Sequence, residues 1–335
     1  MKTAVVILNW NGAEHLRRFL PAVVSTTPDA DIVVADNGST DESRDVVRTD
    51  FPTVRLVELP DNYGFAEGYN RALARLEGYD AFVLLNSDVE PAEGWLAPLT
   101  EVLATQSDVA VVAPKILSYL NRDCFEYAGA AGGYIDFLGY PFCRGRILNR
   151  MERDNGQYDD RRSVFWVGGA AMCCRADVFF ALGGLCGAFF AHMEEIDFCW
   201  RVQLAGYKVV VEPASRVFHL GGGTIATGSP RKIFFNHRNN LAMLYRCASP
   251  LQRAVVAVVR PLLDAMAAVS YLLEGNTGGF KAVWQAYRDF IAWHPRLSRE
   301  RKAIRGAAKG ESHHIYKGSV LLRYAFGRRR FDKLM

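Results

Sequence analysis

The chain has 335 residues, of which 50% are hydrophobic, so it can bury a substantial core and is not a disordered polypeptide. This length permits one large α/β domain or two smaller domains. The net charge of +4 hides an asymmetry, because residues 281–335 hold 14 Lys and Arg against 4 Asp and Glu, which leaves the first 280 residues at −6.

The seven cysteines include no Cys-x-x-Cys pair, and their odd number argues against a complete disulfide framework. A reducing, cytoplasmic location is therefore expected. The apolar run that ends at Leu8 is too short for the core of a signal peptide. The longer apolar segment 251–273 is interrupted by Arg253, Arg260, Pro261 and Asp264, so the sequence predicts no transmembrane helix.

Strand-like and helix-like segments alternate over the first 115 residues. This rhythm predicts βαβ units and a mainly parallel sheet flanked by helices, the α/β class. The expected strands are 3–8, 31–35, 54–58, 81–85 and 109–114, and the expected helices are 13–24, 41–48, 66–76 and 93–103.

The second half of the chain is less regular. Residues 124–160 are rich in Gly, Tyr, Phe and Arg and are interpreted as a hairpin-bearing loop over the sheet. Strands are then predicted at 164–167, 171–175 and 208–211, with a helix at 194–205 and a Gly-rich loop at 221–223. After Pro230 the spacing of apolar residues predicts helices over 231–246, 251–273 and 277–292.

Polar clusters follow three of the first four predicted strands. Ligands of such sheets bind beyond the carboxyl ends of the strands, so these clusters should share one crevice. They are Asn9-Trp10-Asn11-Gly12, Asp36-Asn37-Gly38-Ser39 and Asn86-Ser87-Asp88. Asp36 could accept hydrogen bonds from a pyrimidine base or a ribose, although its segment could also be only a capped turn.

Asp88 follows an apolar strand, where a carboxylate needs a partner. A divalent cation that also binds a diphosphate would supply one, and a simple turn before Pro91 is the alternative. His219 could add a neutral imidazole ligand or be an ordinary polar residue. Glu194, Glu195 and Asp197 begin a predicted helix, where they could favour the helix dipole or supply a general base.

These motifs, in this order, resemble family 2 glycosyltransferases of the GT-A fold, in particular the rhamnosyltransferase-like, non-processive branch. The resemblance covers roughly the first 240 residues. Besides the clusters above, it is carried by Val5 to Leu8, Asn62-Tyr63-Gly64-Phe65-Ala66, Val167 to Met172, Phe189 to Asp197, Arg201 to Gly206, His219 with Gly222-Gly223-Thr224, and Arg238-Asn239.

The resemblance implies a GT-A catalytic domain over 1–240, with a nucleotide-binding half (1–115) and an acceptor-binding half (116–240), followed by a helical, basic region (241–335). It implies that Asp88 and His219 bind Mg²⁺ or Mn²⁺ on the donor diphosphate and that Glu195, or Glu194, is the catalytic base. The nucleotide-sugar-binding residues implied are Asn9, Asn11, Asp36, Asn37, Asn62, Gly64, Phe65, Asn70, Asn86, Ser87, Gly168 and Gly169.

Two positions depart from the family pattern. Asn86 stands where the metal motif Asp-x-Asp has its first Asp, and Glu195 stands where an Asp base is customary. The implied activity is inverting transfer of a sugar from a UDP- or dTDP-sugar, such as dTDP-rhamnose, to a saccharide or lipid-linked saccharide in bacterial surface polysaccharide synthesis. A catalytically silent nucleotide- or saccharide-binding module of the same fold is the alternative.

The basic carboxyl-terminal segment contains four interleaved aromatic residues, Trp284, Tyr287, Phe290 and Trp293. This pattern suits either an anionic membrane surface or a solvated helical cap. A peripheral position on the inner face of the cytoplasmic membrane is one expectation. No nucleic-acid motif accompanies the charge, so nucleic acid is not an expected partner.

Overall fold

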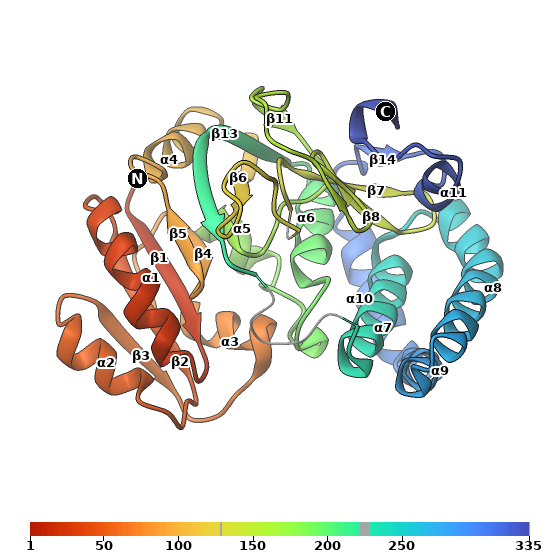
Figure 1. Cartoon of the computed structure of the whole chain (residues 1–335), viewed down its shortest axis with the longest axis horizontal. Coiled ribbons are helices and arrows are strands. Elements are labelled where there is room, and N and C mark those ends of the chain that lie inside the picture. The colour runs from red at the N-terminus through yellow and green to blue at the C-terminus, as the bar shows by residue number, and fades with distance from the viewer. Residues whose placement is uncertain (128, 222–227, 335) are drawn as a thin grey trace.

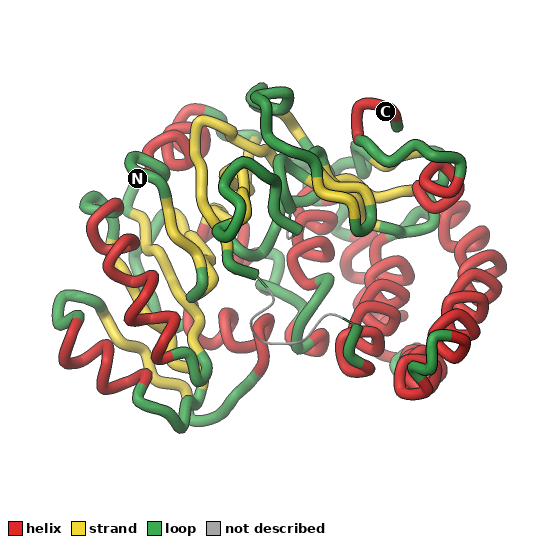
Figure 2. Tube along the Cα trace, viewed as in Figure 1, coloured by secondary structure: helices red, strands yellow, loops and turns green. Residues whose placement is uncertain are grey.

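The computed structural model describes residues 1–127, 129–221 and 228–334. Helices flank a central sheet, and a smaller second sheet leads to a group of helices at the carboxyl end (Figure 1, Figure 2). This mixed α/β architecture confirms the predicted fold class.

The amino-terminal strands pair in parallel, as predicted. They are β1 (Thr3–Asn9), β2 (Asp31–Asn37), β3 (Arg55–Leu59) and β4 (Ala81–Asn86). The other strands of the central sheet are β5 (Val89–Pro91), β6 (Val109–Ser118), β11 (Arg162–Ser163), β12 (Ala171–Arg175) and β13 (Lys208–His219). The order of the strands is β11-β13-β6-β12-β4-β1-β2-β3, and β5 pairs with β13.

The second half of this sheet is mixed rather than parallel. β12 runs antiparallel to both β4 and β6, and it therefore separates two strands that the βαβ rhythm would place side by side. β13 pairs with β6 in parallel along most of its length, and its last residues pair with β5 in the antiparallel sense.

Helices cover both faces of the sheet because β1 alternates its side chains between two cores. Val5 and Ile7 pack on the side of α1 (Ala13–Thr26) and α4 (Leu96–Thr105). Ala4 and Val6 pack on the side of α3 (Gly64–Leu73) and α6 (Glu194–Leu204). All four predicted amino-terminal helices form, the other being α2 (Ser43–Asp50), and α5 (Ala176–Ala181) follows β12.

The segment 124–160 is more ordered than expected. It contributes β7 (Gly133–Asp136), β8 (Pro141–Cys143), β9 (Arg146–Ile147) and β10 (Arg150–Met151) to a second sheet, which β14 (Ile315–Tyr316) completes from near the carboxyl end. The predicted strand 164–167 does not form. Its residues are buried in the core instead, and the Trp166 indole donates to the Tyr134 carbonyl over 2.9 Å.

The carboxyl-terminal region is helical, as predicted, with α7 (Pro230–Cys247), α8 (Pro250–Leu273), α9 (Thr277–Ala292), α10 (His294–Gly306) and α11 (Val320–Ala325). Residue 240, the predicted boundary between the catalytic domain and the helical region, lies within α7. As predicted for 251–273, α8 is one continuous helix of 24 residues, and Pro261 does not interrupt it. Its mean hydropathy is 1.7 over its most apolar 18-residue window, so by length and composition alone α8 could cross a membrane, although the sequence analysis predicted no transmembrane helix.

Candidate functional site at the carboxyl edge of the sheet

The loops after β1 and β2 hold each other by side-chain hydrogen bonds. Asn9 donates to Oδ1 of Asp36 over 3.4 Å, and Oδ1 of Asn11 accepts from the Thr40 amide at 2.8 Å. The buried carboxylate of Asp36 also accepts from Nε of Arg44 at 2.9 Å. A ligand that reaches Asp36 would therefore also meet the half-exposed Arg44 guanidinium, which the sequence motifs did not single out.

The Asn62–Phe65 turn is tied to both the second strand and a distant loop. Oδ1 of Asn37 accepts from the Tyr63 amide at 3.1 Å, and Oδ1 of Asn62 accepts from the Gly64 amide at 2.9 Å. The Phe65 amide donates to the Phe190 carbonyl over 2.6 Å. A Cβ at Gly64, whose φ is +77°, would lie 2.5 Å from the Phe190 ring, so only glycine permits this approach.

Asn70 is placed differently from the other predicted nucleotide-binding residues. Its side-chain amide donates to the Leu185 carbonyl and accepts from the Leu185 amide, both over 2.9 Å. This pair of bonds fastens α3 to the loop before the 3₁₀ helix η1 (Gly187–Phe189). In the structure, Asn70 therefore connects two segments of the chain.

Asp88 and His219 lie together although they are far apart in the sequence. Nε2 of His219 is 3.2 Å from Oδ1 of Asp88, and Nδ1 is 3.1 Å from Oε2 of Glu126. They meet because β5 begins directly after Asp88 and pairs with the end of β13, which places His219 opposite Val89. The side chains of Asp88 and His219 are both buried, and the side-chain nitrogen Nδ2 of Asn86 is also 3.3 Å from Nε2 of His219.

Charge determines the protonation of this cluster. Burial alone would lower the pKa of His219, but the hydrogen bonds and charges of Asp88 and Glu126 outweigh it and raise the pKa to about 10. Burial would raise the pKa of Asp88, and the contact with His219 lowers it on balance. An imidazolium therefore bridges two carboxylates when no cation lies between Asp88 and His219.

Glu194 and Glu195 begin α6 after a segment with an unusual backbone. Phe190, His192 and Met193 have φ angles of +64°, +70° and +73°, and such left-handed conformations are costly for residues other than glycine. Asn239 of α7 compensates for this cost by donating from one side-chain nitrogen to the carbonyls of Phe189, Ala191 and His192, at 3.0, 2.9 and 2.8 Å. Arg238 adds hydrogen bonds to the carbonyls of Ala188 and Phe189.

The two glutamates differ from the third acidic residue of the motif. Oε2 of Glu194 and Oε2 of Glu195 are buried and have no hydrogen-bond partner in the described part of the chain. Burial raises the pKa of Glu195 to about 7, and burial together with the charge of Glu195 raises that of Glu194 well above its ordinary value. Asp197, in contrast, is fully buried between Arg201 and Arg246, at 2.8 Å from each.

The two parts of the site are linked through Gly168-Gly169-Ala170. A Cβ at Gly169 would lie 3.7 Å from Cβ of Glu195 and 3.4 Å from the Phe65 ring. The carbonyl of the next residue, Ala170, accepts from the backbone amide of Asn86 over 2.9 Å. Asn86-Ser87-Asp88, the Phe65 turn and the two glutamates therefore line one region of the sheet edge. The predicted Gly222-Gly223-Thr224 motif lies outside the described residues.

Four further residues belong to this region although the sequence analysis gave them no role: Arg44, Glu126, His192 and Asn239. Burial and the charge of Lys232 lower the pKa of His192 to about 4, so its imidazole is neutral, and its Nε2 has no partner among the residues that the structure describes. His192 and Asn239 lay inside motifs that carried the resemblance. Glu126 and Arg44 had no comparable signal, because only the tertiary contact reveals them.

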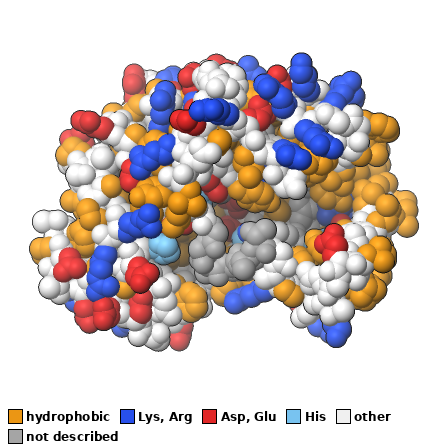
Figure 3. Space-filling model, in the orientation of Figure 1, with side chains coloured by type: hydrophobic (Ala, Val, Ile, Leu, Met, Phe, Trp, Pro, Cys, Tyr) orange, Lys and Arg blue, Asp and Glu red, His pale blue; other side chains and the backbone are white. Residues whose placement is uncertain are grey.

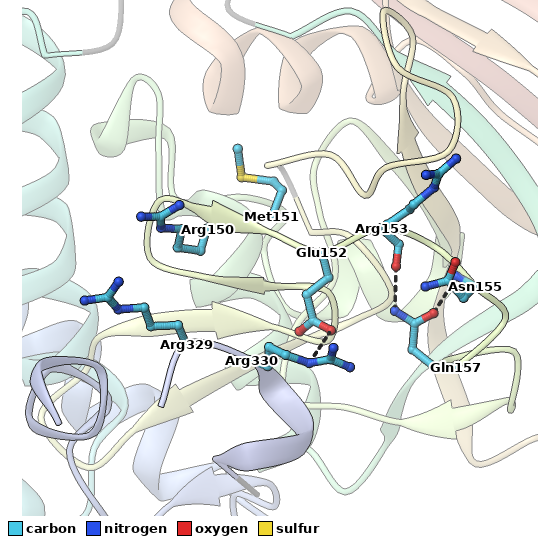
Figure 4. A pocket seen from close by; sticks show the side chains of 8 residues that line it. All are labelled: Arg150, Met151, Glu152, Arg153, Asn155, Gln157, Arg329 and Arg330. Carbon is cyan, nitrogen blue, oxygen red and sulfur yellow. Dashed lines mark hydrogen bonds and ion pairs between the residues drawn. The ribbon is translucent and has the colours of Figure 1, made fainter. Parts of the chain in front are cut away.

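A depression of about 430 Å³ lies elsewhere, between the β9–β10 hairpin and the carboxyl end (Figure 4). It is lined by Met151, Glu152, Asn155, Gln157 and four arginines, Arg150, Arg153, Arg329 and Arg330. Two of these arginines form ion pairs, Arg153 with Asp123 and Arg330 with Asp332. The depression shares no residue with the sheet-edge site.

Comparison with known proteins relates the amino-terminal part of the chain to a known family. Residues 4–156 match the family model described as glycosyl transferase family 2. An N-acetylglucosaminyl-diphospho-decaprenol L-rhamnosyltransferase of Mycobacterium tuberculosis is 27% identical over 233 residues, which cover 64% of this chain and 75% of that protein. The succinoglycan biosynthesis protein ExoA of Rhizobium meliloti is 28% identical over 226 residues, covering 64% of this chain and 62% of ExoA.

Solved structures share the fold at low sequence identity. GalNAc-T7 with UDP, GalNAc and Mn²⁺ matches with a TM-score of 0.63 and 18% identity, over 89% of this chain and 58% of that one. The mannosyltransferase PcManGT of Pyrobaculum calidifontis with GDP-Man and Mn²⁺ matches with a TM-score of 0.51 and 14% identity, over 98% of this chain and 88% of that one. The chain therefore spans little more than half the length of the GalNAc-T7 chain.

Asp197→Ala should lower the free energy of unfolding by about 3–5 kcal/mol, because it leaves two buried guanidinium groups without their shared carboxylate. Asp108→Ala is the matched control. It removes an exposed ion pair with Lys208 and should cost no more than about 1 kcal/mol. Urea unfolding followed by circular dichroism compares the two variants. Equal, small losses would show that Asp197 does not hold the start of α6 in place.

Proposed function

We propose that the chain, whose residues 4–156 match glycosyl transferase family 2, is a metal-dependent, inverting glycosyltransferase of the GT-A fold. Its donor would be a UDP- or dTDP-sugar, including dTDP-rhamnose, and its acceptor a saccharide or lipid-linked saccharide of bacterial surface polysaccharide synthesis. The rhamnosyltransferase relative, whose name specifies a lipid diphosphate, supports this substrate class. The cytoplasm, or the inner face of its membrane, is the corresponding location.

One observation carries the proposal: Asp88 and His219, in contact with each other, lie on the same sheet edge as Glu194 and Glu195, whose buried Oε2 atoms have no partner among the described residues, and Gly169 and Ala170 link the two pairs. An enzyme that displaces a diphosphate needs groups of both kinds, one at the leaving group and one at the attacking hydroxyl.

The residues present fit a divalent cation. In the described residues, no three or more His, Cys, Asp and Glu side chains are grouped to hold a metal, so the protein would supply two ligands and the donor diphosphate would supply others. Asp88 and His219 would hold the ion once Nε2 has lost its proton. Glu126, on Nδ1, would orient the imidazole as carboxylates do behind metal-binding histidines.

The ion would offset the negative charge that develops on the departing diphosphate. Glu195 would accept the proton of the acceptor hydroxyl, whose oxygen attacks the anomeric carbon from the face opposite the leaving group, so that configuration inverts. Burial raises the pKa of both glutamates, that of Glu195 to about 7, so Glu195 ionises near neutral pH. Glu195 is therefore the better base.

The nucleotide would lie at the loops after β1 and β2, where Asp36 and Arg44 present an acceptor and a donor side by side. Asn9, Asn11, Asn37 and Asn62 hold these loops and the following turn in shape. Asn86 and Ser87 extend the same edge toward Asp88. A catalytically silent binding module would need the nucleotide loops but would have no use for two glutamates whose buried Oε2 atoms have no partner in the described chain, because such atoms cost stability.

Asp88→Ala should abolish sugar transfer while the protein stays folded, because the cation would lose its carboxylate ligand. Release of nucleotide diphosphate is measured across UDP- and dTDP-sugars with Mn²⁺, with Mg²⁺ and with chelator. The wild type should release nucleotide only with metal, and Asp108→Ala should match it. Metal-dependent release retained by Asp88→Ala would disprove the metal assignment, whereas nucleotide binding without any release from the wild type would identify a binding module.

Glu195→Gln should lower kcat by at least about 10²-fold, because an amide cannot take up the proton. In the wild type, kcat/KM should fall about tenfold per pH unit below about 7, since only ionised Glu195 accepts a proton. Burying ionised Glu195 costs folding free energy, and this cost grows as the pH rises from 4.5, the ordinary pKa of the side chain, to about 7. Above pH 7 the Glu195→Gln variant should therefore be at least as stable as the wild type. A pH–rate profile without this acidic limb would reject Glu195 as the base.

Asn239→Asp should lower kcat by about tenfold or more with little change in KM for the donor, because a carboxylate cannot donate to the three carbonyls that fix the segment before Glu194. Gln252→Ala removes another buried amide, bonded to the Phe137 carbonyl, and serves as a control for general destabilisation. Steady-state kinetics and thermal melting distinguish the two. If both variants lose activity only in proportion to stability, Asn239 does not position the base.

A further inference from the structure

α8 has an inverted distribution of polarity. Its buried positions follow the spacing i, i+4 and are Gln252, Val256, Arg260, Asp264 and Ala268, so three of the five are polar. Among residues 251–273, all of which the structure describes, every exposed residue other than Ser270 is apolar. Soluble helices normally bury the apolar face and expose the charged one.

The inner face of α8 is held by buried polar contacts. Arg260 donates to the Leu138 carbonyl at 2.9 Å and to Oδ1 of Asn240 at 2.6 Å, and it pairs with Asp264 at 3.2 Å. The other carboxylate oxygen of Asp264 accepts from the Tyr287 hydroxyl of α9 at 2.7 Å. These buried polar contacts fix α8 along the side of the domain, so the helix is not free to leave it.

The outer face of α8 is an apolar strip, which we define as Leu251, Val258, Leu262, Met266, Val269 and Leu273. Val258, Leu262 and Met266 are 69%, 65% and 68% exposed. Figure 3 shows the hydrophobic side chains gathered at the right of the molecule, where Figure 1 places α8. A contiguous strip of this kind on a water-soluble surface marks an interaction site.

A basic groove adjoins the amino-terminal end of this strip. It has a volume of about 410 Å³ and is lined by Pro250, Tyr245 and Ser298 together with four basic residues, Arg253, Arg301, Lys302 and Arg305. Burial lowers the pKa of Arg301, and the nearby charges of Arg253 and Arg305 lower it further. The groove therefore concentrates positive charge beside apolar surface, which is the combination that anionic lipid surfaces attract.

We propose that the apolar strip of α8 and the adjacent basic groove dock the protein on an anionic lipid monolayer, with α8 lying in the plane of the interface. The strip enters the acyl region, and the groove binds lipid phosphates. A second copy of the chain would bring either its apolar strip or its basic groove to this surface. Because the groove is positively charged, it favours anionic lipid over a second copy.

This surface differs from the one expected from the basic tail alone. Of the four aromatic residues in the tail, only Trp284 is exposed, whereas Tyr287, Phe290 and Trp293 pack partly into the protein. The inner face of α8 is joined to α7, because Arg260 contacts Asn240, the neighbour of Asn239. Docking does not depend on the proposed activity and can be tested without it.

Flotation of the full chain with vesicles tests the proposal. The wild type should float with vesicles of phosphatidylcholine and phosphatidylglycerol and much less with phosphatidylcholine alone. Leu262→Glu/Met266→Glu should weaken binding by about tenfold or more, because it brings two carboxylates to the acyl region. Arg253→Glu/Lys302→Glu should remove the preference for anionic vesicles.

Leu120→Glu is the matched control, since it places a carboxylate on a side chain that is 77% exposed elsewhere on the protein and should not change binding. Circular dichroism and thermal melting confirm that each variant is folded, as expected for exposed positions. Unchanged flotation of Leu262→Glu/Met266→Glu would overturn the proposal. So would a wild-type dimer in sedimentation equilibrium that this variant dissociates, or wild-type protein that resists alkaline extraction from vesicles as a spanning helix does.

Discussion

The backbone that leads to Glu194 and Glu195 depends on one side-chain amide. Asn239 donates to three carbonyls of a segment in which three non-glycine residues take left-handed conformations. Each such residue costs on the order of 1 kcal/mol or more, so the segment requires an external constraint. The Phe65 amide, at the start of α3, supplies a second constraint by donating to the Phe190 carbonyl. The segment before Glu194 and Glu195 is thereby held from α3 and from α7 at once.

The same segment explains why Glu194 and Glu195 differ from Asp197. The buried arginines Arg201 and Arg246 both pair with Asp197, one turn further into the helix than Glu194. Their other contacts go to the carbonyls of Leu182 and Gly184 and to Glu300. The glutamates face a region where the described chain offers their Oε2 atoms no donor, and burial raises their pKa values. Asp197 thus serves charge pairing, and the two glutamates within the same four positions of the helix are left for the proton transfer that we propose.

The sequence predicts the parts of this architecture that follow from local pattern. β1 to β4 and their helices follow apolar periodicity and turn residues, and the strand-end residues Asn9, Asp36 and Asp88 follow from parallel topology. β12 could not be placed between β4 and β6, because its position depends on long-range pairing. The second sheet was missed because several of its strands have only two or three residues, and β14 joins from more than 150 residues away.

Within the site, motif order identified Asp88 and His219, but only the pairing of β5 with β13 explains how they meet and why Glu126 joins them. For 251–273, the sequence analysis did not consider on which side of the helix the charged residues lie. Arg260 and Asp264 were treated as interruptions of an apolar segment, whereas the i, i+4 spacing places both on the buried side, where they pair with each other. The charges therefore leave the outer face apolar instead of making the helix soluble. Their spacing could have been read from the sequence, but the direction in which they face is determined by Asn240 and Tyr287 on neighbouring helices.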